Sequence, residues 1–204
     1  MKPLKPPRPL VTLKDPQELE RICKGLAALD AIVCEDRESR AYSFDAAWSV
    51  KKKLRLASMR NGSGDDWFLV FATGGAFFKS FWHEYPRGKP AEIYEGLGAS
   101  LEPQLREPAF SMDAVTFGGF FDGAKWTLRG NPKPLAGELP LLDADAAAYC
   151  AYARAVFEVD LPEAVVAHVL AGKSLDTKLV ARLSDQRTLA ELKADLAEIG
   201  YGKA

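Results

Sequence analysis

Two aspartates, a histidine and a glutamate near the middle of the chain are the side chains best suited to chemistry. Asp65 and Asp66 follow a short glycine-containing loop, and His83 and Glu84 follow the apolar run 76–82. Carboxylates and imidazoles serve as general acids and bases and as ligands of divalent metal ions. With their neighbours they give eight candidate ligand-binding residues: Arg60, Asn61, Ser63, Asp65, Asp66, His83, Glu84 and Glu107.

A β-hairpin is the element that would bring these residues together. The run 67–72 is apolar on both faces, which is typical of a central strand covered on both sides. A second apolar run covers 76–82, and Gly74-Gly75 between them suits a tight two-residue turn.

This turn fixes a register across the hairpin. The predicted cross-strand pairs are Phe71 with Phe78, Trp67 with Trp82, Asp66 with His83, and Asp65 with Glu84. Because opposed like charges repel, Asp65 and Glu84 would need a cation, from Arg60 or Arg87, or a raised carboxyl pKa. A carboxylate beside His83 favours the imidazolium form or orients a metal-bound imidazole. Asp66 and His83 are therefore the candidate metal pair.

The surrounding pattern predicts an α+β fold. Of the 21 aromatic residues, 17 lie between Tyr42 and Trp126, where a sheet core would concentrate them. We expect an antiparallel, meander-like sheet of about five or six strands, with one helix before it and a helical tail after it. The predicted strands are 40–48, 54–59, 67–72, 76–82, 114–121 and 124–129, and the predicted helices are 15–29, 143–157, 160–171, 175–183 and 188–199.

Helix starts and proline positions divide the chain into three parts. Capping boxes are predicted at Asp15, Asp160 and Thr188, each with a glutamate three residues later. Prolines and lysines in 1–14 indicate a flexible arm. The sheet domain would occupy 15–140, and the helical tail 141–204 would pack on that domain.

Composition excludes several classes of function. The formal net charge of −1 and a pI near 6.2 argue against nucleic-acid binding. No apolar run approaches the ~20 residues of a membrane span, and no signal peptide is recognisable. Three widely spaced cysteines argue against a disulfide framework or a zinc ribbon. We expect a cytoplasmic protein without a cofactor, apart from a divalent metal at the candidate pair.

A basic run, Lys51-Lys52-Lys53, precedes the second predicted strand. Residues 51–60 carry five basic groups and no acidic group. Such a run could contact phosphates or an acidic partner. Alternatively, it is a solvated loop whose lysines protect an edge strand from pairing with other chains.

Four short segments resemble a family of uncharacterised bacterial proteins. They are Ser58-Met59-Arg60-Asn61-Gly62-Ser63-Gly64-Asp65, Phe81-Trp82-His83-Glu84, Glu107-Pro108-Ala109-Phe110 and Glu198-Ile199-Gly200-Tyr201. The resemblance implies a bacterial source and carries no activity. Small bacterial α+β proteins of this kind often resemble toxin-immunity or accessory proteins.

Two classes of function follow. Without a complete P-loop, EF-hand or nucleophile elbow, the sequence favours a non-catalytic protein-binding module, immunity-like or accessory. The alternative is a metal-dependent or acid–base hydrolase that uses Asp65, Asp66, His83 and Glu84. The sequence leaves the partner, the substrate and the oligomeric state open.

Overall fold

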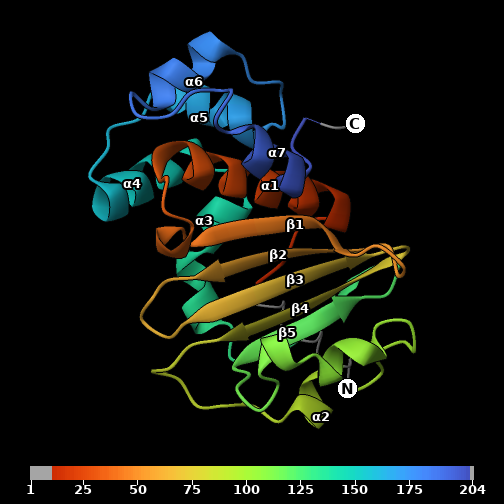
Figure 1. Cartoon of the computed structure of the whole chain (residues 1–204). Coiled ribbons are helices and arrows are strands. Elements are labelled where there is room, and N and C mark those ends of the chain that lie inside the picture. The colour runs from red at the N-terminus through yellow and green to blue at the C-terminus, as the bar shows by residue number, and fades with distance from the viewer. Residues whose placement is uncertain (1–10, 203–204) are drawn as a thin grey trace, which may run out of the picture.

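The protein folds as a six-stranded antiparallel meander with helices before and after it (Figure 1). The computed structural model describes residues 11–202. Neighbouring strands in the sheet are also neighbours in the chain, so the strand order is sequential from β1 to β6. The α+β class and the meander predicted from the sequence are confirmed.

All six strands lie close to their predicted positions, because aromatic-rich apolar runs flanked by turn residues mark strands. Their bounds are β1 (Tyr42–Ser49), β2 (Leu54–Arg60), β3 (Asp66–Ala72), β4 (Gly75–Phe81), β5 (Phe117–Phe121) and β6 (Trp126–Gly130).

The helices agree less closely with the prediction. The first extends to Val33, beyond the predicted end near Leu29, since no glycine or proline stops it before Cys34 turns to extended backbone. A short helix at Leu139–Leu142 was not predicted. The helices are α1 (Pro16–Val33), α2 (Pro90–Ile93), α3 (Leu139–Leu142), α4 (Ala146–Phe157), α5 (Glu163–Leu170), α6 (Thr177–Leu183) and α7 (Lys193–Ile199), with 3-10 turns η1 (Arg37–Ser39), η2 (Glu102–Arg106), η3 (Pro108–Phe110) and η4 (Lys133–Gly137).

One of the three predicted capping boxes forms in full. Thr188 and Glu191 exchange side-chain-to-backbone hydrogen bonds in both directions, but α7 begins only at Lys193 and not at the predicted residue 188. Asp15 caps α1 by accepting from the Gln17 amide. The box predicted at Asp160 is wrong, because α5 starts only after Pro162 and the Asp160 carboxylate pairs with Arg154.

The two faces of the sheet belong to two separate cores. One face presents Trp67 and Leu69 to the larger core, which also contains α1 and residues of the helical tail. The other presents Phe68 and Val70 to a smaller core that the segment 85–115 closes. In Figure 1, α3 passes behind the strands and α2 lies on the near side. The prediction that β3 is covered on both sides is therefore confirmed.

The helical tail shares its core with the sheet and α1. Val169 and Leu170 of α5 are buried in the same cluster as Leu26 of α1. The two helices approach closely at Gly25, where an added Cβ would lie 2.9 Å from the Leu170 Cα atom.

The predicted N-terminal arm is only partly described. Val11 and Leu13 are each 5% exposed and belong to the larger core, which differs from the expected flexible segment. Residues 1–10 of the predicted arm lie outside the described residues. Within the described part, no helix is both long and apolar enough to span a membrane.

A buried carboxylate joins α1 to the sheet and to α4. Asp30 is 0% exposed, and its carboxylate accepts hydrogen bonds from the Tyr42 amide at 2.9 Å and the Tyr149 hydroxyl at 2.8 Å. The Tyr152 hydroxyl donates a longer bond of 3.3 Å. Burial raises the pKa of Asp30 from 3.8 to about 7, although these donors oppose the shift.

This raised pKa predicts a pH-dependent stability. Because the folded state favours the neutral carboxyl, the contribution of Asp30 is fully present below about pH 4 and declines as the pH rises through about 7. We expect the free energy of unfolding of the wild type to fall, relative to that of Asp30→Asn, between pH 5 and pH 8. Urea unfolding at several pH values would measure this difference, and a difference independent of pH would contradict the prediction.

Candidate functional site

The hairpin that was expected to assemble the candidate site has a different register. Thr73 and Gly74 are the turn residues, and Ala72 pairs with Gly75. Gly74 has a φ of +76°, and a left-handed conformation at the second turn position favours glycine. Gly75 is therefore the first residue of β4 and not a turn residue.

The predicted cross-strand pairs are therefore wrong. Phe71 pairs with Ala76, Trp67 with Ser80 and Asp66 with Phe81. The error is a shift of two positions, so each side chain keeps its predicted face of the sheet while its partner changes.

Strand alternation separates the two candidate aspartates. Asp65 has the same parity as Trp67 and lies on the side of the larger core, while Asp66 has the parity of Phe68 and lies on the side of the smaller core. The predicted four-residue cluster thus becomes two separate groups.

The first group is an aspartate–histidine pair. One Asp65 carboxylate oxygen accepts from the His83 amide at 2.9 Å and lies 2.7 Å from its Nδ1 atom. The other oxygen accepts from the Asn61 side-chain amide at 2.8 Å. Partial burial favours the neutral acid, but these bonds outweigh it and lower the pKa of Asp65. The Asp65 side chain is 13% exposed and that of His83 is 48% exposed.

The loop before Asp65 is organised by Asn61. Its side-chain oxygen accepts from the backbone amides of Ser63 and Asp65, at 2.9 and 3.2 Å. Ser63 itself is exposed. Asn61 therefore acts as a turn-forming residue here.

The two glutamates of the candidate set lie elsewhere. Glu84 is exposed in the turn after β4 and is not opposite Asp65 through a strand pair. Glu107 accepts from the Ala109 amide and caps η3. Neither carboxylate is a partner in the hydrogen bonds of Asp65 or Asp66 described above and below.

The second group is a buried ion pair between Asp66 and Lys79. The Lys79 Nζ atom lies 2.6 Å from the Asp66 carboxylate, and the lysine side chain is 0% exposed. Burial lowers the pKa of Lys79 and raises that of Asp66, while their attraction opposes both shifts. The ammonium also lies 5.4 and 5.5 Å from the ring centroids of Phe68 and Phe81.

Lys79 was missed because the sequence reasoning concentrated on acids and histidine. The signal was present, since Lys79 is the one basic residue in the apolar run 76–82. A charge inside a buried strand requires a partner.

Glu138 is a further carboxylate that the sequence analysis did not select. It accepts from the Tyr42 hydroxyl at 2.8 Å and from the Trp67 indole at 3.3 Å. Burial raises its pKa, and the nearby charge of Asp65 adds to this effect. Glu138 directly follows η4, and only the tertiary structure shows that its carboxylate lies beside Tyr42 of β1 and Trp67 of β3.

The candidate metal pair does not assemble in this geometry. Asp66 is bound to Lys79 and His83 to Asp65. Over residues 11–202, no group of three or more histidine, cysteine, aspartate or glutamate side chains is arranged to hold a metal ion. The pair Asp66–His83 is therefore not brought together.

Three hollows of the surface lie away from both groups. One of about 650 Å³ borders β6 and is lined by Val11, Phe121 and Trp126. Others of about 410 and 400 Å³ lie at the β3–β4 turn and between α4 and α6. The linings of these three hollows do not include Asp65, Asp66 or His83.

Comparison of the chain with protein-family models, with curated proteins and with solved structures found no match.

The Asp66–Lys79 pair predicts unequal effects of single and double substitutions. Asp66→Asn leaves a buried ammonium without its counter-charge and should cost about 3–5 kcal/mol of stability. Adding Lys79→Met removes that charge, so we expect the double variant to recover part of the loss. Urea unfolding would measure all three proteins. Asp113→Asn, at an 84% exposed side chain, is the control and should change stability by less than about 0.5 kcal/mol. A double variant no more stable than Asp66→Asn would refute the argument.

Proposed function

We propose that this chain is a non-catalytic protein-binding module, immunity-like or accessory, that contacts an acidic partner protein through its β1–β2 turn, Val50–Lys53. The observation that carries the proposal is the exposure of Val50, which is 77% exposed. Among the described residues, Val50 and Val156 are the exposed large hydrophobic side chains. Covering this side chain with a partner would remove its apolar surface from water, which favours binding.

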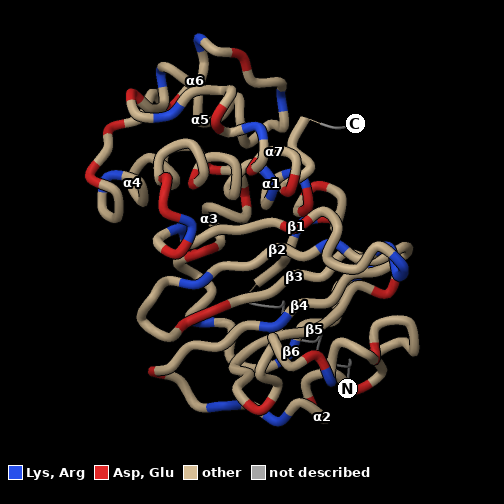
Figure 2. The backbone as a smooth tube through the Cα atoms, viewed as in Figure 1, with Lys and Arg blue, Asp and Glu red and all other residues tan. Residues whose placement is uncertain are grey.

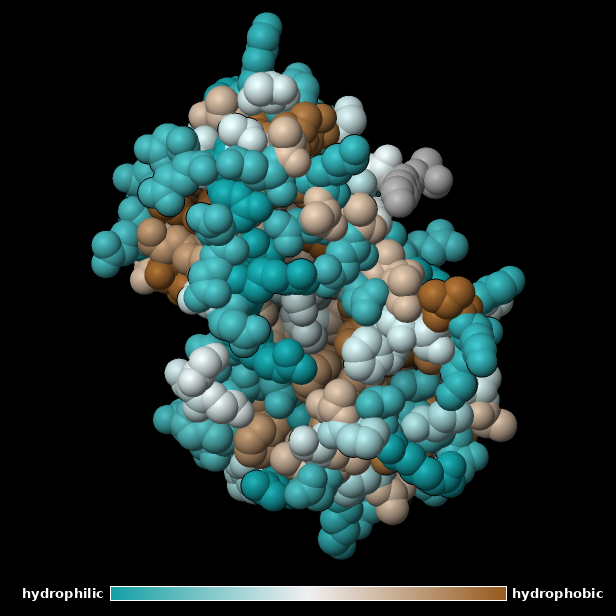
Figure 3. All heavy atoms as spheres, viewed as in Figure 1, coloured by the Kyte–Doolittle hydropathy of each residue, from teal (hydrophilic) through white to brown (hydrophobic). Residues whose placement is uncertain are grey.

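Three lysines follow this valine in the turn. Lys51, Lys52 and Lys53 are all exposed, and none forms an ion pair within the described part of the chain. The next basic residue, Arg55, is already paired with Glu20 at 2.8 Å. Figure 2 shows the basic turn at the right edge of the molecule, and Figure 3 shows a small hydrophobic patch at that edge among hydrophilic side chains. Uncompensated positive charge favours an acidic partner.

The position of the lysines argues against edge protection as their only role. Protective lysines are expected along an edge strand. The edge strand β1 contains no lysine or arginine, and the three lysines lie in the turn beyond it. Lys53 also has a φ of +53°, a left-handed conformation that costs a non-glycine residue free energy.

The base of the turn is anchored to the smaller core. Trp48 is half-buried and stacks against Phe110, with ring centroids 6.5 Å apart. A turn held in this way loses little conformational entropy when a partner binds.

The chemistry of the cysteines supports a cytoplasmic location for this module. Cys23, Cys34 and Cys150 are all free thiols, and reduced thiols are typical of the cytosol.

Charge reversal at the turn tests the proposal. Affinity capture from cells of the source organism would compare the wild type with Lys51→Glu/Lys52→Glu/Lys53→Glu. A matched control carries Lys173→Glu/Lys178→Glu/Lys193→Glu, which changes three other exposed lysines by the same charge. We expect the wild type and the control to recover the same acidic protein, and the turn variant to recover at least about tenfold less.

Two results would reject the proposal. One is recovery by the turn variant equal to that of the wild type. The other is an equal loss in the turn variant and the control, which would indicate a general charge effect. Thermal unfolding of each variant verifies that the fold is intact.

One observation favours acid–base hydrolysis as a second candidate. Asp65 holds the Nδ1 side of His83, which directs the Nε2 atom away from this carboxylate, on a side chain 48% exposed. A carboxylate in this position orients an imidazole as a general base.

A panel of chromogenic carboxylic and phosphoric esters tests this second candidate. Turnover that falls by about 10²-fold or more in His83→Gln, with an unchanged thermal midpoint, would support it. Absence of turnover in the wild type, or equal turnover in the variant, would eliminate it.

A further inference from the structure

The smaller-core face of the sheet carries a group of cations that the proposed function does not use. Three positive side chains, Arg60, Lys79 and Arg87, surround the rings of Phe68 and Phe81. We infer that Arg60 and Arg87 form a binding site for an oxyanion, the carboxylate or phosphate group of a small ligand. This inference does not rest on the β1–β2 turn.

Arg60 is the more open of the two arginines. It ends β2 opposite Asp66, and its guanidinium carbon lies 5.3 Å from the Phe68 ring centroid. The residue is exposed, and within residues 11–202 its guanidinium has no hydrogen bond or ion pair with another side chain. Its donors are therefore available to a ligand.

Arg87 makes the same kind of cation–π contact with the ring of Phe81. Its guanidinium carbon lies 5.4 Å from the Phe81 centroid, and its side chain is 59% exposed. Its ion pair with Asp113 is long, at 3.9 Å, and the Asp113 side chain is 84% exposed. Such a surface pair contributes little free energy, so a ligand can replace it.

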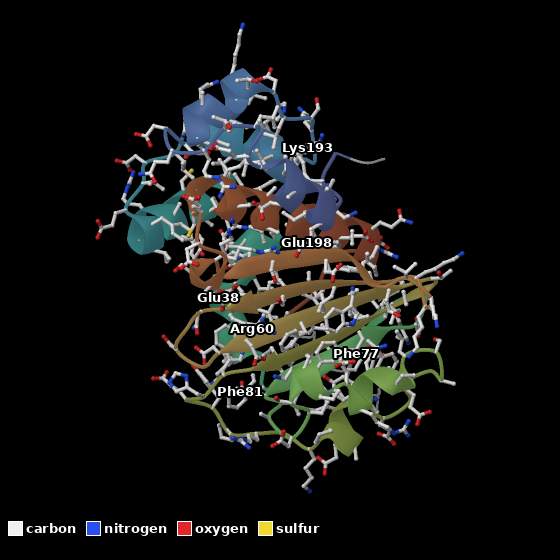
Figure 4. All side chains as sticks on the ribbon, in the orientation of Figure 1. Glu38, Arg60, Phe77, Phe81, Lys193 and Glu198 are labelled. Atoms are coloured by element: carbon white, nitrogen blue, oxygen red, sulfur yellow. The ribbon has the colours of Figure 1, made fainter. Side chains whose placement is uncertain are left out.

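The strand register places the rings that contact Arg60 and Arg87 close together. Arg60 pairs with Asp66 across β2 and β3, and Asp66 pairs with Phe81 across β3 and β4. Figure 4 shows Arg60 and Phe81 at the same end of the sheet, with Phe77 farther along β4. The Lys79 ammonium lies between the rings of Phe68 and Phe81.

The charge balance of this group favours an anion. Three cations face two carboxylates, Asp66 and Asp113. Asp66 is occupied by Lys79 at 2.6 Å, and Asp65 nearby is occupied by His83 on the other side of the strand. One excess positive charge therefore remains, and it lies with Arg60 and the weakly paired Arg87.

A cation–π contact with an aromatic ring is suited to this role. It restrains the guanidinium plane while leaving the N–H edges free for paired hydrogen bonds to an oxyanion. A guanidinium pairs with carboxylate or phosphate through two parallel bonds, which are stronger than neutral ones.

Titration of the folded protein with inorganic phosphate and with citrate tests the site. Sodium chloride at matched ionic strength is the reference, and the Nε–Hε NMR signals of Arg60 and Arg87 are followed. We expect both signals to shift saturably, and we expect binding to weaken at least about tenfold in Arg60→Gln/Arg87→Gln. Arg106→Gln is the control, because that arginine is 75% exposed and, among residues 11–202, its ion pair is with its neighbour Glu102.

Each outcome bears on the inference. Saturation by phosphate alone identifies a phosphate group, saturation by citrate alone identifies a carboxylate, and saturation by both indicates recognition of the shared oxyanion. No saturable shift beyond the chloride reference, or equal affinity in the double variant, would overturn it. The turn variant Lys51→Glu/Lys52→Glu/Lys53→Glu should retain this binding, which separates the site from the proposed function.

Discussion

The burial of β3 on both faces is the constraint on which the rest of this structure depends. Successive side chains of a strand point to opposite sides of the sheet, and here each side faces a hydrophobic core. Trp67 and Leu69 enter one core, and Phe68 and Val70 enter the other. A polar group near this strand must therefore find a partner on its own side, which assigns Asp65 to His83 and Asp66 to Lys79.

The same rule accounts for the other buried charges. Asp30 is surrounded by three donors, and Glu138 accepts from a tyrosine and a tryptophan. These bonds join elements that are distant in the chain, such as α1 to α4 and η4 to β3. The Trp82 indole is an exception among the described residues, because its buried N–H has no hydrogen-bond partner. Buried polar groups thus specify how the layers meet, while apolar burial supplies most of the stability.

The surface divides into regions with different chemistry. At one end of β1 and β2 the exposed turn combines Val50 with three free lysines, which suits an acidic protein surface. At the other end of β2, Arg60 rests on a ring and suits a single oxyanion. The Asp65–His83 pair differs from both regions. The Asp65 carboxylate already accepts hydrogen bonds within the protein, while part of the His83 imidazole is exposed to solvent.

The positions of the strands and of most helices could be predicted because they depend on local patterns. Continuous apolar runs bounded by turn residues mark β3 and β4, and Asp15 followed by Pro16 marks the start of α1. The hairpin register could not be predicted in the same way. It depends on which of two adjacent glycines takes the left-handed conformation, and either choice preserves the apolar pattern of both strands.

By itself, the sequence determined the α+β class, the meander and the approximate positions of the strands, because these follow from apolar runs and turn residues along a continuous chain. Only the tertiary structure decided which polar and charged side chains contact one another. Lys79 pairs with Asp66, Glu138 accepts from Tyr42, and the Arg87 guanidinium lies over the Phe81 ring, across loops and strands whose relative placement depends on packing in three dimensions. A pairing free energy depends on distance and burial, and neither quantity is encoded in the spacing of residues along the chain.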